Sequence, residues 1–324
     1  MRPAAPARAA VRLHSVLMAA HPLLPDDILV FERGWLSSNN ILLRADAGSA
    51  LVDSGYVSHA AQTLALVENA LEDQPLTLLV NTHLHSDHCG GNALLQTLYP
   101  GLRTLIPPGH AEQVRQWDAQ ALSYAPTGQS CAPFDFDAIL PPGSTLRLGQ
   151  RDWQVHAAPG HDPHSVILFE PELHLLISAD ALWENGFGVV FPEIEGIEAF
   201  DEVEATLDLI ESLQPRLVIP GHGAVFQRVD AALAVARQRL AQFRGDPRRH
   251  ARHAAKVLIK FKLLELQQVA LSDFRSWIAQ TSFFGLLHRT HFSHHDFTVW
   301  SDELMQDLVR AGAARIDSQM LFNQ

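Results

Sequence analysis

The feature that most constrains this chain is a cluster of three histidines and one aspartate within six residues, His83-Leu84-His85-Ser86-Asp87-His88. It follows an apolar run at residues 76–80, which predicts a buried strand, and it precedes Gly90-Gly91. Imidazole nitrogens and carboxylate oxygens are ligands of borderline divalent metals such as zinc. The alternative is a histidine-rich surface loop, but this pattern would arise in only roughly 0.4% of shuffled chains. The cluster therefore predicts a metal site at a strand end.

Length and charge suggest two units in a soluble globular protein. The 324 residues are 47% hydrophobic and carry a formal net charge of −12. From residue 235 onward there are 13 Lys and Arg against 8 Asp and Glu, a net of +5, so the first 234 residues carry −17. We therefore predict an N-terminal extension at 1–24, a main domain at 25–234 and a C-terminal domain at 235–324. The acidity of the larger part argues against a surface that coats nucleic acid.

The location is expected to be cytoplasmic and without a membrane anchor. No apolar run reaches the length of a membrane span, and the apolar patch at residues 16–20 is too short for a signal-peptide core. Cys89 and Cys131 are the two cysteines, which cannot form a disulfide framework. Cys89 follows the histidine cluster, but since the cluster already offers enough ligands, we expect it to be a packing residue.

The order of the predicted elements favours a layered α/β sandwich with two sheets inside and helices outside. Strands are expected at residues 28–31, 40–44, 50–52, 76–80, 103–106, 145–148, 153–157, 165–169, 174–178 and 217–219. Helices are expected at residues 58–71, 91–98, 111–122 and 199–213. Residues 124–142 hold four prolines and predict a long loop, which is often functional.

Further ligand candidates follow three later strands. His161, Asp180 and His222 each lie a few residues beyond a predicted strand end. A single buried histidine is more often a hydrogen-bonded core residue. Together with the cluster at residues 83–88, however, four predicted strands end in a His or Asp, and this order favours a site. His83 and His85 are two apart and point the same way in an extended segment, whereas Asp87 and His88 begin a helix and point elsewhere.

This geometry favours two adjacent divalent metal ions. We assign metal 1 to His83, His85 and His161, and metal 2 to Asp87, His88 and His222, with Asp180 bridging both. Two such ions share a hydroxide that attacks the substrate, and Asp87 is the expected catalytic residue that orients it. Zinc is the first expectation for the metals, with iron or manganese as alternatives.

The ordered set resembles the metallo-β-lactamase fold superfamily over roughly residues 25–230. The resemblance implies a four-layer αβ/βα sandwich with the metals at one edge, and chemistry similar to that of hydroxyacylglutathione hydrolase-type enzymes. Asp53, in Val52-Asp53-Ser54-Gly55, looks like the aspartate that supports the metal site from behind its ligands; capping a turn is the alternative. His164 is expected to support the site, to donate a proton or to be an ordinary paired histidine. Tyr124, Trp183 and Phe187 either line the substrate pocket or simply pack.

The C-terminal unit predicts helices at residues 271–280 and 301–312, the second capped by Ser301, and then a hairpin at 313–322. Helices followed by a hairpin are similar to a winged helix. The strongest basic run, residues 237–262, holds nine Lys and Arg and one acid, and it is either an anion-binding face or a solvated helix face. The predicted recognition helix is acidic, which disfavours nucleic acid. His288, His291, His294 and His295 form a second cluster that lacks carboxylates, so an additional metal site is not expected there.

These observations predict a metal-dependent hydrolase of a small ester, thioester or lactone. Three alternatives stay open: a metallonuclease that uses the C-terminal unit, a mononuclear iron oxidoreductase on the same fold, and a non-catalytic regulator that keeps the ligands. The expected partner is a small-molecule substrate, with no nucleic acid and no membrane, and a homodimer is compatible with the sequence.

Overall fold

The computed structural model describes residues 22–72 and 74–324. Most of the predicted N-terminal extension, residues 1–21, lies outside the described residues. Over residues 28–245, two sheets face each other with helices on their outer faces, so the predicted four-layer sandwich is confirmed.

The first sheet has six strands in the order β1-β2-β3-β4-β5-β6. β1 to β3 pair antiparallel and β3 to β6 pair parallel. The strands are β1 (Ile28–Phe31), β2 (Asn40–Leu43), β3 (Ser49–Val52), β4 (Leu76–Val80), β5 (Arg103–Ile106) and β6 (Ala138–Ile139). In a parallel sheet neighbouring strands end at the same edge, so the loop after β4 lies beside the loop after β3.

The second sheet has five strands in the order β11-β10-β9-β8-β7. β10 and β11 are parallel and the other pairs are antiparallel. The strands are β7 (Thr145–Leu148), β8 (Arg151–Ala157), β9 (Val166–Glu170), β10 (Leu175–Ala179) and β11 (Leu217–Pro220). All of the strands predicted from the sequence are present, with ends that differ by one or two residues.

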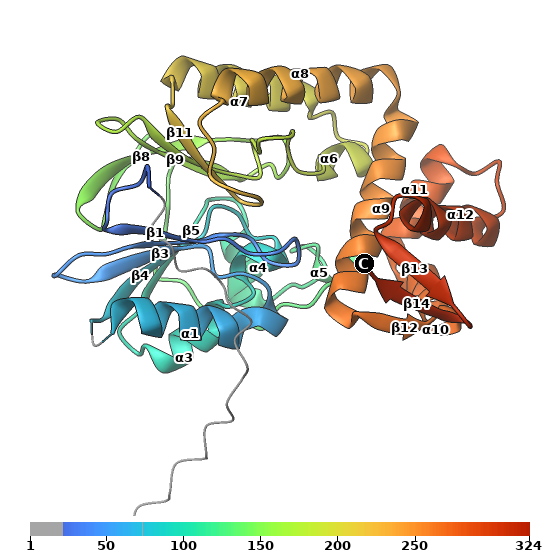
Figure 1. Cartoon of the computed structure of the whole chain (residues 1–324), viewed down its shortest axis with the longest axis horizontal. Helices are drawn as coiled ribbons and strands as arrows, with labels where there is room; N and C mark the ends of the chain where they lie inside the picture. Colours follow the sequence, from blue (N-terminus) through green and yellow to red (C-terminus); the bar gives the residue numbers. More distant parts are fainter. Residues whose placement is uncertain (1–21, 73) are drawn as a thin grey trace, which may run out of the picture.

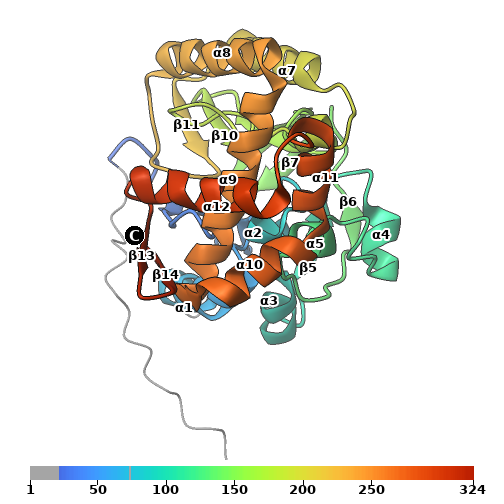
Figure 2. The same ribbon diagram turned by 90° about the vertical axis from the view of Figure 1, so that its right-hand side faces the viewer.

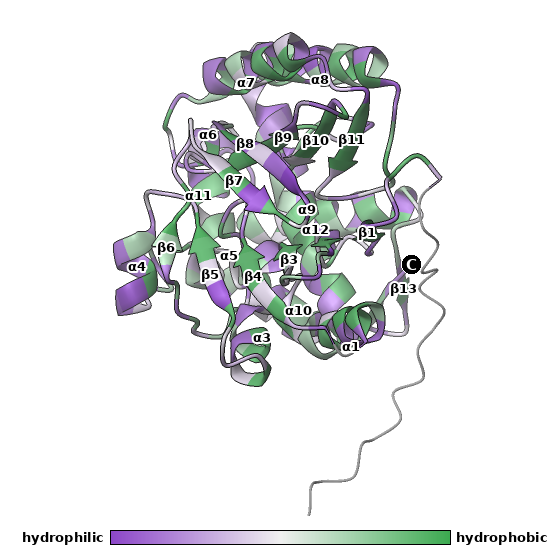
Figure 3. Ribbon diagram, turned by 90° about the vertical axis from the view of Figure 1, so that its left-hand side faces the viewer, coloured by the Kyte–Doolittle hydropathy of each residue, from purple (hydrophilic) through white to green (hydrophobic). Residues whose placement is uncertain are grey.

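Side-chain alternation builds the layers. In β3, Ala50 and Val52 join the core between the sheets, whereas Leu51 packs under the outer helices. In β10, Leu175 and Ile177 join the same central core and Leu176 faces outward. Successive residues of a strand point to opposite faces, so continuously apolar strands are buried on both sides. Figure 3 shows this apolar character most clearly in β10 and β11, whereas β8 carries hydrophilic residues as well.

Two pairs of helices cover the sandwich. α1 (Ala60–Leu71) and α3 (Asn92–Leu98) lie outside the first sheet, and α7 (Phe200–Leu213) and α8 (Val229–Gly245) lie outside the second (Figure 1). Short elements connect the layers: η1 (Val57–His59), α2 (Ser86–Cys89), α4 (Ala111–Gln116), α5 (Tyr124–Thr127) and α6 (Phe191–Ile194). The predicted helix at 111–122 is too long, because Trp117 adopts a left-handed conformation with φ 51° and ends α4.

The C-terminal part holds α9 (Pro247–Leu266), β12 (Gln268–Ala270), α10 (Leu271–Gln280), α11 (Ser282–His291), α12 (Phe297–Arg310), β13 (Ala314–Asp317) and β14 (Met320–Asn323). The predicted hairpin is present and β12 joins it as a third strand, in the order β12-β14-β13. Figure 2 shows α12 crossing α9. Helices followed by a small hairpin sheet match the predicted winged-helix-like order.

The cap of α12 is Asp296, whose carboxylate accepts from the backbone N–H groups of Thr298 and Val299, and not Ser301, which lies inside the helix. The domain division at residue 235 stays a prediction, but that residue lies within α8, which packs with α7 on the second sheet. A further apolar core contains the buried residues of the C-terminal helices from Ala251 onward, together with Val189 and Ile194. Within the described residues, no helix has the length and apolar character needed to cross a membrane.

Candidate metal centre

Four chain segments that leave strands converge at one edge of the sandwich. Residues 83–88 follow β4, and His161 follows β8. Asp180 directly follows β10, and His222 follows β11. The backbone N–H of Gly221 donates to the carbonyl of Ala179 at 2.7 Å, which ties two of these loops together. Residues far apart in sequence are thereby held around one point.

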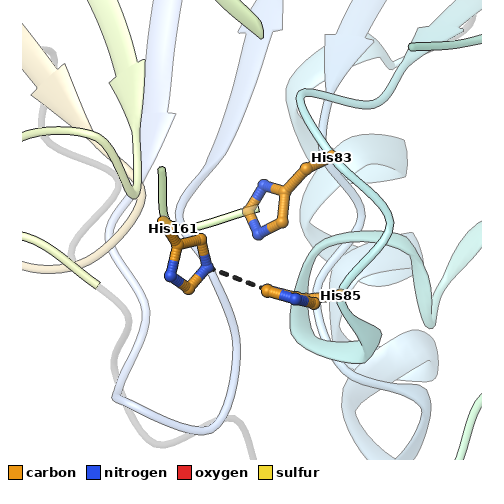
Figure 4. A group of neighbouring side chains, drawn as sticks. All are labelled: His83, His85 and His161. Atoms are coloured by element: carbon orange, nitrogen blue, oxygen red, sulfur yellow. Dashed lines mark hydrogen bonds between the residues drawn. The ribbon is translucent and has the colours of Figure 1, made fainter. Parts of the chain in front are cut away.

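The first group consists of His83, His85 and His161. One ring nitrogen from each lies within 4.8 Å of the others. Nδ1 of His85 and Nε2 of His161 are 2.8 Å apart, and the three side chains point toward one another (Figure 4). His83 is completely buried, so this group lies at the base of the site.

The second group consists of Asp87, His88, Asp180 and His222, again with ligand atoms within 4.8 Å of one another. Oδ2 of Asp87 lies 3.1 Å from Nε2 of His222. Oδ1 of Asp180 lies 3.4 Å from Nε2 of His88. Each member offers one nitrogen or oxygen to a common centre.

Asp180 lies between the two groups. Its Oδ1 faces His88, whereas its Oδ2 is 3.4 Å from Nε2 of His161 in the first group. One carboxylate therefore presents one oxygen to each group, and the two groups form a single continuous site.

Neighbouring residues hold the imidazoles in fixed orientations. Nδ1 of His88 donates to Oδ2 of Asp53 at 2.8 Å, and Asp53 also accepts from the backbone N–H of Thr82 at 2.9 Å. Nδ1 of His161 donates to the carbonyl of Val189 at 2.6 Å. Each donation leaves the Nε2 lone pair of the same ring directed into the site, as in metal-binding histidines whose other nitrogen is hydrogen-bonded.

Asp53 is in a left-handed backbone conformation with φ 57°. This conformation is uncommon outside glycine, although aspartate and asparagine tolerate it better than most residues. The buried carboxylate makes three hydrogen bonds, to Thr82 and His88, which hold it there. Asp53 therefore lies behind His88 and holds its ring, a position that suits the supporting role expected for it.

The donor set fits a bound cation. Nε2 of His83 and Nε2 of His88 are buried and form no hydrogen bond among the described residues. Since His88 donates through Nδ1, its Nε2 lone pair faces the Asp180 carboxylate, and two acceptors so placed require a proton or a metal ion between them. Burial alone would lower the pKa of His88, but without a metal the carboxylates of Asp180 and Asp53 raise it well above its ordinary value.

The imidazoles of His83 and His85 are held neutral. Burial, and then the neighbouring His88 and His85 rings, lower the pKa of His83 well below its ordinary value. Burial and His161 lower the pKa of His85 to about 4. A neutral imidazole is the form that binds a metal, so these rings are ready to act as ligands at neutral pH.

A cavity of about 670 Å³ opens above the two groups. His85, Asp87, His161, Asp180 and His222 reach its wall. Its volume lies within the ordinary range for small-molecule sites.

Two of the predicted pocket residues line this cavity. The Tyr124 hydroxyl donates to the Leu84 carbonyl at 2.8 Å, and Nε1 of Trp183 donates to Oδ1 of Asp180 at 3.2 Å. Phe187 does not line it: its side chain is buried against Phe243, because it points toward α8, and Phe191 faces His85 and His161 instead.

Other predicted residues lie outside both groups. The His164 ring packs edge-on against His110, with centroids 4.6 Å apart, and the cavity lining does not include it. Cys89 is buried and lies 3.2 Å from the Tyr124 hydroxyl, as expected for a packing residue. Within residues 22–72 and 74–324, the two groups above are the only sets of ligand residues in metal-binding proximity, so His288, His291, His294 and His295 form none.

Several residues of the site were not predicted from the sequence. The Trp35 ring stacks on His222, with centroids 5.3 Å apart and planes 11° apart. The Val189 carbonyl orients His161, and Arg239 and α9 line the far side of the cavity. A single exposed aromatic, a backbone carbonyl and a distant helix carry no local sequence signal for such positions.

Comparisons with known proteins agree with this geometry. The family model described as the metallo-beta-lactamase superfamily matches residues 33–222. Human acyl-coenzyme A thioesterase MBLAC2 is 27% identical over 64% of this chain and 82% of its own length. A hydroxyacylglutathione hydrolase of Francisella tularensis subsp. holarctica is 28% identical over 49% of this chain and 54% of its own.

Among solved structures, a metallo-beta-lactamase family protein from Thermus thermophilus has a TM-score of 0.50 at 19% identity, covering 94% of this chain and 96% of its own. This match shows a common fold that extends into the C-terminal helices. A second structure, of a protein in a di-iron-bound form, has a TM-score of 0.51 at 25% identity and covers 63% of this chain and 96% of its own. The sandwich, the site and the matched family model together show that this chain belongs to the metallo-beta-lactamase superfamily.

Proposed function

We propose that this protein is a metal-dependent hydrolase with two divalent ions, zinc in the first instance, that cleaves a small ester, thioester or lactone. The observation that carries the proposal is the pair of ligand groups that share Asp180 at the wall of a cavity. The relatives support it, since the similar proteins named above include a thioesterase of acyl-coenzyme A and a hydrolase of hydroxyacylglutathione.

The chain's own residues supply the positioning. His83, His85 and His161 would hold one ion, Asp87, His88 and His222 the second, and Asp180 both. Such a pair of ions lowers the pKa of bound water and polarises the substrate oxygen. Asp87 lies at the cavity wall and is the residue that would orient the attacking water. Hydrolysis forms one carbon–oxygen bond from water, breaks the acyl–oxygen or acyl–sulfur bond, and transfers the water's proton to the departing alcohol or thiol.

The experiment that tests the function joins metal quantification on the native protein to a panel of ester, thioester, lactone and phosphodiester substrates. We expect two equivalents of a divalent metal and turnover of acyl substrates that Asp87→Ala abolishes. One iron per chain with oxygen consumption would overturn the hydrolase in favour of the iron oxidoreductase. No turnover on any substrate at full metal loading would indicate the regulator instead.

The contacts of the basic run do not favour the nuclease alternative. Arg237 pairs with Asp208 and Glu211 at 2.8 Å each, and Arg244 pairs with Asp201 and Glu204. On the C-terminal side, Arg252 pairs with Asp307 of α12. A phosphate-binding surface needs cations that are not already neutralised by carboxylates, so Arg237, Arg244 and Arg252 are better described as joining α8 and α9 to their neighbours. Arg239 differs from them, because it lines the cavity and has no carboxylate partner among the described residues.

A further inference from the structure

The two faces of helix α9 contact different parts of the molecule. One face, which includes Ala251, Ile259 and Leu263, packs into the core of the C-terminal helices. The other face lines the cavity that contains the candidate metal centre, through His253, Lys256, Val257, Lys260, Phe261 and Leu264. Residues three and four apart share one side of a helix, so the cavity face is a continuous stripe along α9. From His253 to Leu264 this stripe is about 16 Å long at 1.5 Å per residue.

The end of the stripe near α8 is cationic. Arg239 lines the cavity beside His253 and Lys256, and its guanidinium packs against Gly186, where an added Cβ would come within 2.5 Å of Nη1. Arg239 is half-buried, and no described carboxylate lies within ion-pair distance of it, although Glu184 lines the same cavity. Arg237, two residues earlier on α8, has two carboxylate partners. Arg239 is therefore a cation directed at the cavity without an internal counter-ion among the described residues.

The surroundings of His253 disfavour its protonated form. Burial, together with the charges of Arg239 and Lys256, lowers the pKa of His253 to about 4. Lys256 lies 3.8 Å from Asp307, which neutralises it in part. An anion at this end would meet Arg239 at a half-buried site, where a charged hydrogen bond contributes more than at a fully exposed surface.

The other end of the stripe is apolar. Val257 is 37% exposed although it is a large aliphatic residue, and it faces the cavity. Phe261 packs edge-on against Tyr56, with ring centroids 5.1 Å apart, and Leu122 lies on the cavity wall as well. The one cation in this half, Lys260, donates to the carbonyls of Ala313 and Gln324 and to Oδ1 of Asn323, so its ammonium group is turned to the C-terminal strands.

We propose that the substrate is an amphiphilic anionic acyl ester or thioester that lies along α9, with its anionic group at Arg239 and Lys256, its apolar chain on Val257, Phe261 and Leu264, and its scissile carbonyl at the metal centre. This proposal rests on the proposed function and adds the substrate class to it. The anion is a phosphate or a carboxylate, because a guanidinium binds both in the same way.

Binding of unreactive probes tests the subsite without hydrolysis. Octyl phosphate, octanoate, octanol and inorganic phosphate are titrated into the metal-loaded full-length protein by calorimetry. We expect at least one of the two octyl anions to bind about tenfold or more tightly than octanol or inorganic phosphate, since charge and chain both contribute. The stronger of the two octyl anions identifies the source of the negative charge. Equal binding of octyl phosphate and inorganic phosphate would overturn the apolar half of the proposal.

Matched variants separate the two ends of the stripe. Arg239→Gln is compared with Arg237→Gln on the same helix, and Val257→Gln with Val235→Gln, because Val235 is similarly exposed at 38% but does not line the cavity. We expect Arg239→Gln to weaken the octyl anion about tenfold and to leave octanol unchanged. Val257→Gln should weaken the binding of octyl phosphate, octanoate and octanol several-fold and leave that of inorganic phosphate unchanged.

Full affinity for octyl phosphate and octanoate in both Arg239→Gln and Val257→Gln would overturn the proposal, since the anion would then bind the metals alone. If acyl substrates are hydrolysed, Arg239→Gln should raise KM for the anionic substrate and leave kcat and the neutral substrate unchanged. Binding that responds to these variants without any hydrolysis would uphold the subsite and refute the hydrolase function, so the two failures are distinguishable.

Discussion

Two clusters of histidines in this chain have similar composition but different surroundings. His83, His85 and His88 follow a buried strand, and their rings meet His161, His222 and the Asp180 carboxylate, which follow other strands. His288, His294 and His295 lie at the end of α11 and in the loop before α12, where Nε2 of His288 bonds to the His295 carbonyl at 2.9 Å. His294 and His295 are exposed.

The difference shows what makes a histidine cluster a site. In the sandwich, the Asp53 carboxylate holds Nδ1 of His88 and the Val189 carbonyl holds Nδ1 of His161. The Nε2 atoms of the two rings are therefore directed into the site. In the C-terminal cluster, among the described residues, no carboxylate from another element completes a ligand set. Spacing of the ligands is therefore less informative than the strand ends and acceptors around them.

Loss of one buried ligand should have the largest effect. His83→Ala should lower metal affinity and activity by more than about 100-fold, the upper range for residues behind the ligands. Metal content after dialysis and turnover by the same preparation measure it. His288→Ala is the matched control and should retain both. Equal metal loss in the two variants would make the clusters equivalent and refute the distinction.

The supporting carboxylate should have the next largest effect. Asp53→Asn keeps the size and tolerates the left-handed backbone, but it removes the negative charge beside His88. We expect metal affinity or activity to fall about 10- to 100-fold while the fold is retained. Competition with a chelator dye gives the affinity, and circular dichroism checks the fold. Wild-type affinity would mean that Asp53 only caps a turn.

His250 of α9 provides a pH test of the join between the two regions. Its Nε2 accepts from the backbone N–H of Val190, and burial lowers its pKa from the ordinary 6.5 to about 3. The unfolded chain therefore binds the proton first, so this contribution to stability is complete above pH 6.5 and is lost as the pH falls toward 3. Between pH 6.5 and 4.5 the free energy of unfolding should fall by about 2 kcal/mol from this residue.

Urea unfolding of the wild type and His250→Gln at both pH values measures this contribution. Glutamine can still accept the hydrogen bond but does not titrate, so the variant should have a correspondingly smaller loss on acidification. An identical pH dependence in the two proteins would show that His250 is not held neutral by the fold.

The smallest expected effect is at the cap of α12. Asp296→Ala removes the carboxylate that accepts from the backbone N–H groups of Thr298 and Val299 and should cost about 1 kcal/mol of stability. Metal content should not change, in contrast to Asp53→Asn. Thermal unfolding with metal analysis of the same samples compares these two carboxylates, and metal loss in Asp296→Ala would contradict the separation of the regions.

The sandwich and the candidate ligands were predictable because both depend on local patterns. Apolar runs ending in His or Asp indicate buried strands and the positions after them, as at Val80 and Ala179. The ligand role itself stays a prediction until metal is measured. Trp35, Arg239 and the cavity face of α9 could not be predicted, because they reach the site only through tertiary packing.

Smaller errors have local causes. Phe187 and Phe191 are the same residue type in the same segment after β10, so the sequence does not distinguish them. The path of this loop decides which of the two faces the cavity. Ser301 and Asp296 are both good caps, and the helix begins at the earlier one because residues 297–300 continue its apolar face with Trp300.

The start of α9 has a consequence for variation in length among related chains. Asp246 accepts from the backbone N–H groups of Arg248 and Arg249, and Pro247 occupies the first turn, so the first residue of the helix is set by this cap. Inserting one residue between the cap and His253 would rotate every later side chain by about 100°. The core face would then no longer pack into the C-terminal core, and the cavity face would no longer line the cavity. Insertions and deletions are therefore expected to accumulate before Asp246 or after Leu266, and substitutions between them.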